Sequence, residues 1–336
     1  MAQAQNYFQS QNVEVWYQKE STPGTQPDDA GLKKLQTTSF SIPEASVPVE
    51  YSAQRAGTFT QTASQGHHAQ GTKMWTFDTT LRGTPASVLL ATEAVFEQAS
   101  SEAALNNDYT FPNATYLNGA SSASTFEFRW INGGSDATNH NMVMQGCVGT
   151  GFTLAEDIGS EGGELVCTIN WASAFAPIYS ADDISSSSYD EGTPKNIRSL
   201  DDSATGINGG SLEKLVIQSW ELSVTRNIER IHYKDTTDGS FAPFGYAMVG
   251  GFEVTGSLTA IRNDDVYSLL AKFYDSNTVD INIAESSGFA IALDKCFLNE
   301  PSIDNGGAVL METIPFTVVG ADNIGSTVKM VGITIA

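Results

Sequence analysis

Four blocks of residues recur in the same order in the two halves of the chain, and this repetition constrains the fold more than any other feature. Each block shares residue types, or the same alternation of apolar and polar positions, with its partner. The paired blocks are 34–42 with 214–222, 77–85 with 254–263, 141–147 with 290–296, and 162–169 with 306–314. Self-similarity on this scale indicates a duplicated structural unit. A fused pair of like units is a common way to build a symmetric assembly from fewer chains.

Length and composition allow two β-rich domains. The 336 residues are enough for two hydrophobic cores, and 40% hydrophobic with 17% charged residues is typical of folded protein. The formal charge is −22, from 39 acidic and 17 basic residues. Such a chain is not expected to grip nucleic acid through its phosphates. The charge is compatible with a surface that DNA passes without sticking, and equally with solubility alone.

The cysteines and the apolar segments indicate where the chain works. Cys147, Cys167 and Cys296 form no C-x-x-C pair, so buried free thiols are expected. The first residues lack the features of a signal peptide, and no apolar run reaches the ~20 residues of a membrane span. We therefore expect a protein that stays in the cytoplasm or ends in a particle assembled there.

The order of predicted elements divides the chain into four parts: an arm at 1–32 with a short strand at 13–17, a first domain at 33–178, a Ser/Asp-rich linker at 179–211, and a second domain at 212–336. Period-2 alternation predicts the strands. They are expected at 35–51, 73–82, 124–131, 140–154 and 164–171, and then at 214–224, 228–234, 252–261, 278–284, 288–297, 307–319 and 327–335. No element is predicted in the linker.

One helix is expected in each half. Thr84 is a suitable N-cap before Pro85, and Asn263 is a suitable N-cap before two acidic residues. Each domain is therefore predicted to be a mainly β sandwich or half-barrel with one flanking α-helix. Long polar loops are expected at 53–72 and 234–251, the second of which holds Phe241, Phe244 and Tyr246.

No catalytic constellation stands out, and no metal site or cofactor is predicted. His67 and His68 lie in a predicted loop, and no phosphate loop, dinucleotide fingerprint or nucleophile elbow is present. Asp201, Asp202, Asp235 and Asp238 could bind calcium weakly, but the specific loop pattern is missing. What does recur is a small, neutral to acidic face on several strands, opposite apolar faces that include Trp220, Leu222, Val224 and Ile281.

Several segments resemble the major tail tube proteins of long non-contractile-tailed (siphophage-type) bacteriophages in their two-domain form. The resemblance covers about residues 33–320 and is a pattern of strand order and scattered residues. The segments are 145–154, 165–169 after the Gly162-Gly163 hairpin, 220–227, 251–258 and 312–316. It does not include the arm or the linker, whose roles stay open.

The resemblance implies two tandem tube domains whose sheets join around a ring into an inner barrel, with rings stacked into a conduit for DNA. A fused pair implies three chains in a pseudo-hexameric ring. The implied partners are further copies of the chain, the tail terminator, tip and tape-measure proteins, and genomic DNA that passes without sequence-specific contact. It implies a place in the virion tail and no catalytic residue.

Within this interpretation the polar strand faces are expected to line the lumen, and the aromatics of the second loop are expected to touch a neighbouring ring. The predicted lumen-lining residues are Glu127, Glu221, Ser223, Thr225, Glu253 and Asp280, and the predicted inter-ring residues are Phe241, Phe244 and Tyr246. A β-rich virion binding module, such as a tail-tip adhesin or a capsid decoration protein, is the alternative. An enzyme is the least favoured class because no nucleophile–base pair is present.

Overall fold

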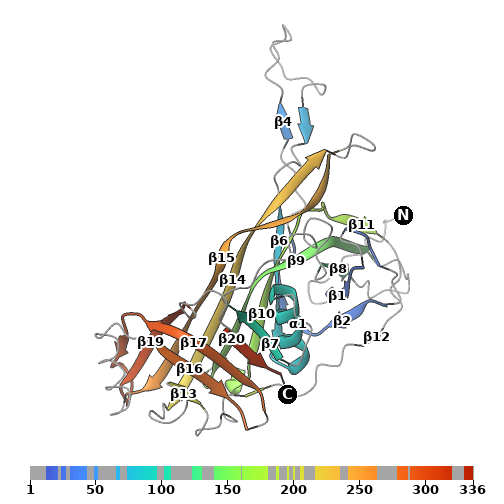
Figure 1. Ribbon diagram of the computed structural model, residues 1–336. Coiled ribbons are helices and arrows are strands. Elements are labelled where there is room, and N and C mark those ends of the chain that lie inside the picture. Colours follow the sequence, from blue (N-terminus) through green and yellow to red (C-terminus); the bar gives the residue numbers. More distant parts are fainter. Residues whose placement is uncertain are drawn as a thin grey trace, which may run out of the picture.

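The described part of the chain folds into a mainly β structure with long antiparallel strands and one flanking helix (Figure 1). This computed structural model describes residues 13–21, 24–27, 31–43, 49–51, 66–68, 74–96, 102–106, 123–130, 140–159, 161–180, 187–188, 195–196, 200, 205–207, 216–234, 241–262, 278–286, 288–319 and 329–335. In this part of the chain every strand pairing is antiparallel except β12–β2. No helix among the described residues is long and apolar enough to cross a membrane.

The described elements follow the chain in two series. The first half contains β1 (Val13–Lys19), β2 (Lys33–Leu35), β3 (Thr37–Phe40), β4 (Val49–Tyr51), β5 (Gly66–His68), β6 (Trp75–Arg82), α1 (Pro85–Phe96), β7 (Glu102–Asn106), β8 (Ser124–Trp130), β9 (His140–Asp157), a 3-10 turn (Glu161–Gly163), β10 (Val166–Ser173) and β11 (Ile178–Ser180). The second contains β12 (Ser187–Ser188), β13 (Gly206–Ile207), β14 (Ile217–Lys234), β15 (Phe241–Ile261), β16 (Val279–Ala284), β17 (Ala290–Leu298), β18 (Ser302–Asp304), β19 (Met311–Val318) and β20 (Lys329–Thr334).

Strand pairing repeats between the two halves. In the first half the pairs are β1–β8, β8–β9, β9–β10, β10–β6, β6–β3 and β9–β11. In the second half they are β13–β16, β16–β17, β17–β19, β19–β15, β15–β14 and β17–β20. The equivalent strands also follow the same order along the chain. The duplication predicted from the four blocks is therefore present in the topology.

The paired registers also correct the sequence alignment of the first, third and fourth blocks. When Leu81 is placed on Leu258, Phe40 corresponds to Leu222, where the first block placed it on Trp220. Gly149 corresponds to Cys296, where the third block placed Cys147.

In the fourth block, Leu81 pairs with Cys167, and its counterpart Leu258 pairs with Ile314. Cys167 therefore corresponds to Ile314, whereas the sequence blocks placed Ile169 there. Each of these slips is two residues, and because side chains alternate with period two, it leaves the inward and outward faces unchanged.

Two ladders join the halves into one sheet. The second part of β9 pairs with the first part of β14 over residues 151–157 and 219–225. We call this ladder the internal seam. In addition, β7 from the first half pairs with β20 from the second. The division into domains at 33–178 and 212–336 stays a prediction.

A continuous apolar core lies under the sheets and against α1. Trp220, Leu222 and Val224 of β14 and Ile281 of β16 are buried, as the alternation predicts. Helix α1 begins as predicted, because the Thr84 hydroxyl accepts a hydrogen bond from the Ser87 N–H at 3.2 Å. All three cysteines are buried and unpaired, as expected. The helix expected after Asn263 lies outside the described residues.

The N-terminal strand belongs to the body of the protein and is not a free arm. β1 pairs with β8 along its whole length and with β2, and Val15 and Trp16 are buried. Parts of the predicted linker also pair, since β12 joins β2 and β13 joins β16. Long-range pairing of these short segments overrides their polar composition.

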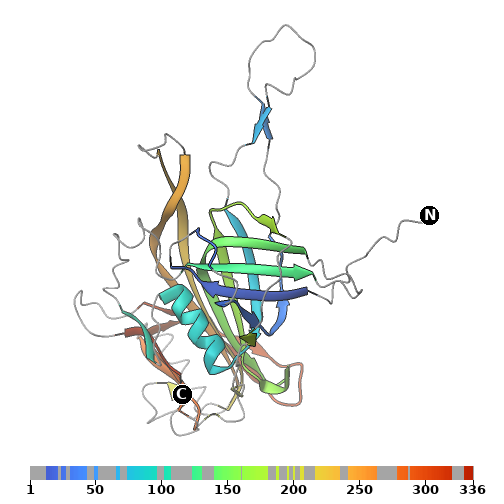
Figure 2. The ribbon, with the colours of Figure 1, turned by 90° about the vertical axis from the view of Figure 1, so that its right-hand side faces the viewer.

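The prediction of a loop at 234–251 was wrong. Residues 217–234 and 241–261 form one long hairpin, β14–β15, which projects beyond the sheet at the same end as β4 and β5 (Figures 1 and 2). Pro243 lies within β15, where a two-stranded ribbon has an open edge that tolerates a missing N–H. The counterpart loop at 53–72 lies outside the described residues except for Gly66–His68.

Candidate functional site

One face of the joined sheet is covered by small hydroxyl side chains in cross-strand register. A single row crosses seven strands and passes straight over the internal seam. Its members are Ser39, Thr80, Thr168, Thr153, Ser223, Thr255 and Thr317. The hydroxyls of Thr80 and Thr168 lie 3.1 Å apart, and those of Thr259 and Thr313 in a neighbouring row lie 3.0 Å apart. We call this surface the polar face.

The charge on the polar face is mainly negative. Two residues from the hydroxyl row along the same strands lie the carboxylates of Asp78, Glu221 and Glu253 and the guanidinium of Arg82. The Asp157 carboxylate lies four residues from the row on β9. Arg82 is already bound, because its Nη2 donates to both oxygens of Glu164 at 2.7 and 2.9 Å. The carboxylates therefore dominate the field over this face.

Four of the predicted lumen-lining residues meet on the polar face. Glu221, Ser223 and Thr225 alternate with the buried residues of β14, and Thr225 lies directly opposite Glu253 of β15. Glu221 and Glu253 are exposed. The strand register predicted for this part of the sequence is therefore correct.

Glu127 and Asp280 lie elsewhere. Glu127 is 2% exposed, and its carboxylate accepts hydrogen bonds from Gln26 Nε2 at 2.9 Å and Asn141 Nδ2 at 3.3 Å. It is buried because the segment around Gln26 lies over this face of β8, which the sequence pattern of β8 could not reveal. Asp280 lies on β16 and accepts from the backbone N–H of Lys295 at 3.0 Å, with the Lys295 ammonium 3.6 Å away.

The three predicted inter-ring aromatics lie in the projecting hairpin. Phe241 pairs with Lys234 and Tyr246 with Arg230 through the backbone, so they belong to a strand and not to a loop. Their side chains lie outside what the structure describes. Their contact with a neighbouring ring stays a prediction.

Among the described residues, the two ends of the joined sheet are open edges. Within the described residues β3 pairs only with β6, and residues 298–304 pair only with β19. Exposed aliphatic side chains lie on both edges, since Ile42 is 42% exposed and Ile303 is 51% exposed. Unpaired strand edges with apolar side chains favour pairing with another strand.

The duplication identifies what these exposed side chains correspond to. When Leu81 is placed on Leu258, Ile42 takes the position of Val224, which is fully buried at the internal seam. Ile303, which pairs with Glu312, takes the position of Glu156, which is 2% exposed on the other side of that seam. The open edges thus carry the two sides of a second seam that one chain cannot close.

The internal seam contains a buried acid. Glu156 lies opposite Trp220, whose indole N–H donates to Glu156 Oε2 at 2.6 Å, while Glu156 Oε1 has no hydrogen-bond partner among the described residues. Glu285 and Lys195 lie buried nearby, with their charged ends 3.8 Å apart. Burial mainly raises the pKa of Glu156 from 4.5 to about 8; the Trp220 hydrogen bond opposes this, and the Glu285 charge adds to it.

We predict that Glu156 makes the protein less stable as the pH rises. Between pH 4.5 and about 8 the folded chain keeps a proton that the unfolded chain releases. The free energy of unfolding should therefore fall by up to about 1.4 kcal/mol per pH unit in this window, and level off above it. The variant Glu156→Gln, which keeps an acceptor for Trp220, should remove this component of the slope. Urea unfolding at pH 5.5, 6.5, 7.5 and 8.5 measures it, and parallel curves for the two proteins would contradict it.

Arg226 is a second polar contact across the seam. It is 2% exposed, and it donates from Nε to Gly149 O at 2.7 Å and from Nη2 to Ala94 O at 3.0 Å. Ala94 lies in the last turn of α1, so a cation from the second half caps a helix of the first. Glu156 and Arg226 were missed in the sequence, although both occupy inward positions of alternating strands, where a charge is unexpected.

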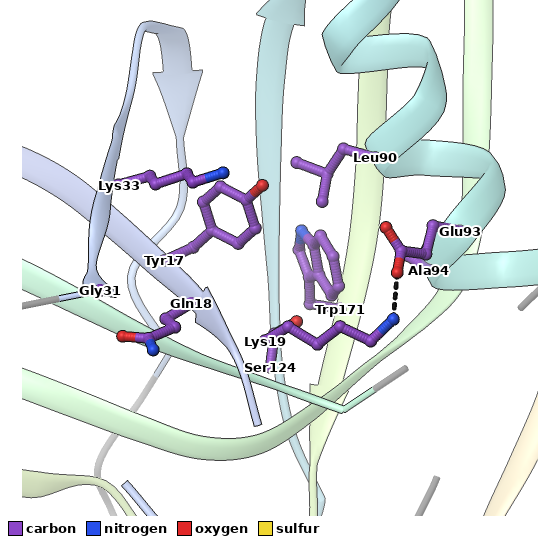
Figure 3. A pocket seen from close by; sticks show the side chains of 10 residues that line it. All are labelled: Tyr17, Gln18, Lys19, Gly31, Lys33, Leu90, Glu93, Ala94, Ser124 and Trp171. Atoms are coloured by element: carbon purple, nitrogen blue, oxygen red, sulfur yellow. Dashed lines mark hydrogen bonds and ion pairs between the residues drawn. The ribbon is translucent and has the colours of Figure 1, made fainter. Parts of the chain in front are cut away.

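A cleft of about 380 Å³ opens between α1 and β1 (Figure 3). Trp171 lies at its base, and the Lys19 ammonium binds the Glu93 carboxylate across one end. Because Trp171 points away from the polar face, the cleft is on the opposite side of β10. None of the predicted site residues lines it. In the described part of the chain no group of three His, Cys, Asp or Glu side chains could hold a metal ion.

No protein-family model matches this chain, and no curated protein matches it in sequence.

Proposed function

We propose that this chain is a tail tube subunit that polymerises through its sheet edges into stacked rings around a DNA channel. The observation that carries the proposal is the internal seam together with its two open counterparts. A chain that contains one seam between like halves, and half of another seam at each end, is suited to head-to-tail association. Heterologous association of this kind generates a ring when the rotation closes.

The number of chains follows from the duplication. Each chain supplies two similar units, so a ring of six units needs three chains. Averaged cross-sections of purified assemblies, with the mass of the smallest closed assembly, test this number. Six chains of this length in one ring would contradict it.

The polar face supports a channel lining. It crosses the internal seam without interruption, so closing the second seam would extend it around the ring. A DNA duplex carries one charge per ~1.7 Å, and every lysine or arginine on the wall would make a transient phosphate contact. A wall of hydroxyls and carboxylates repels the duplex weakly from all sides and lets it move.

We predict that reversing the charge of this face makes the channel retain DNA. Glu221→Lys with Glu253→Lys should leave folding and tube formation intact, because both side chains are exposed. The variant tubes should bind double-stranded DNA at low salt, with an affinity that falls steeply as salt rises. Asp280→Lys, on another surface, is the matched control. Equal DNA binding by control and variant tubes would show that the added lysines act wherever they lie, and would contradict the assignment of the polar face to the channel.

A virion binding module is the second candidate. The long projecting hairpin favours it, since such a hairpin could present a contact surface to another protein. Negative-stain images at high protein concentration separate the two. Tubes support the first proposal, and discrete particles support the second.

A further inference from the structure

Within the described residues, the second sheet of the first half has one strand fewer than its counterpart in the second half. The strands β11–β9–β8–β1 correspond to β20–β17–β16–β13, but β20 carries one more strand, β7, on its outer edge. β11, the counterpart of β20, carries nothing on that edge within the described residues and forms a margin of the sheet (Figure 2). Among the residues that the structure describes, this sheet is thus one strand smaller in the first half than in the second.

Exposure reflects this difference. On β20, Val331 is 0% and Ile333 is 1% exposed. On β11, Ile178 is 46% and Tyr179 is 68% exposed. An isoleucine and a tyrosine beside a backbone edge that no described strand pairs with are the features of a site that takes up an extended segment by strand addition.

The donor cannot be the segment equivalent to β7 in a neighbouring second half. In the first half residues 83–123 separate β6 from β8 and contain both α1 and β7. In the second half only residues 262–278 separate β15 from β16, which leaves no room for a helix like α1 and a further strand. The ring proposed above therefore leaves β11 uncovered.

β1, which directly follows residues 1–12 in the chain, starts at the end of this sheet where β11 ends. Glu14, Arg129, Asn141 and Ser180 form one row across β1, β8, β9 and β11. The start of β1 is therefore three strand spacings from β11, about 15 Å. Twelve extended residues span up to about 40 Å. This segment holds no proline, no glycine and no charged side chain, so it can pair along an edge without repulsion from a chain of net charge −22.

We propose that β11 is an acceptor edge for residues 1–12 of a second copy of this chain. The proposed contact resembles that of β7, a strand of the first half that pairs with the edge of β20 in the second half. Here the added strand would come from another copy of the chain. The inference rests on the proposed function, since it supplies a contact between subunits that the ring seams do not use. It should link one ring to the next, because β11 lies near the end where the β4–β5 and β14–β15 hairpins project (Figures 1 and 2).

The test compares the full chain with two altered chains. One lacks residues 1–12, and the other is the full chain with Ile178→Lys and Tyr179→Lys. Val216→Lys, at a 50% exposed valine away from this edge, is the control. In the full chain, amide exchange at residues 178–180 should slow at least tenfold when the protein is concentrated enough to assemble. Both altered chains should keep the fast exchange and form rings without long tubes, and a synthetic peptide of residues 1–12 should restore protection to the truncated chain only.

Three other results overturn the inference. Exchange that does not change with concentration excludes a second copy, and slow exchange in dilute full chain shows that the segment pairs within its own chain. Normal tubes from both altered chains show that the edge is not used.

A further outcome separates this inference from the proposed function. If lysines at Ile42 and Ile303 leave assembly intact while the β11 variants abolish it, the proposed ring fails and the acceptor edge stands.

Discussion

Ile42→Lys with Ile303→Lys should leave a folded monomer that no longer associates. These side chains correspond to Val224 and Glu156 at the internal seam, so closing the second seam would bury them. Burying an isoleucine contributes about 1.5–3 kcal/mol, and two buried ammonium groups without partners would add a larger penalty. The association constant per seam should therefore fall by more than a hundredfold, which size-exclusion chromatography with light scattering can measure.

The control for this variant is Val216→Lys, which places a lysine at a similarly exposed position outside both edges. It should assemble like the unaltered chain. All three proteins should unfold at similar urea concentrations, because the altered positions are exposed in the single chain. Rings of normal size from the double variant would refute the assignment of the edges.

Arg226→Met should give the largest loss of stability of any single change considered. The substitution removes the donors to Gly149 O and Ala94 O and leaves two carbonyl groups buried at the junction of β9, β14 and α1. An unsatisfied buried acceptor costs about 1–3 kcal/mol, so the expected loss is about 2–4 kcal/mol after relief of the buried charge. Urea unfolding at fixed pH measures it.

Arg82→Met provides the comparison, because Arg82 binds Glu164 on the surface with 46% of its side chain exposed. Surface ion pairs of this kind contribute about 0–1 kcal/mol. Equal losses for the two variants would mean that the seam is not held by Arg226. If Arg226→Met lowers the free energy of unfolding only in the half that contains α1, the two halves unfold independently.

Local patterns in the sequence were sufficient for much of the fold. Alternation placed Glu221, Ser223, Thr225 and Glu253 on one face, with Trp220, Leu222 and Val224 on the other. Helix α1 was predicted from Thr84 and Pro85. These features depend on residues close together in the chain, where the period of apolar positions and the preferences of helix starts act directly.

Which strands pair with or cover one another could not be predicted in the same way. Glu127 alternates correctly within β8, yet the segment around Gln26 covers it. The hairpin of β14 and β15 continues through a segment whose glycines and proline are typical of loops. In each case a distant segment supplies the hydrogen bonds and the cover. A strand's own residues do not determine which edge it meets.

The sequence by itself determined that the chain is mainly β, that its two halves repeat, and which side of each main strand is apolar. The tertiary structure alone decided that β9 meets β14, that β7 crosses to the second half, and that Arg226 and Glu156 are buried between the halves. The physical reason is that alternation is a property of one strand, whereas a seam is a contact between two edges. Its chemistry exists only after strands far apart in the chain have been brought side by side.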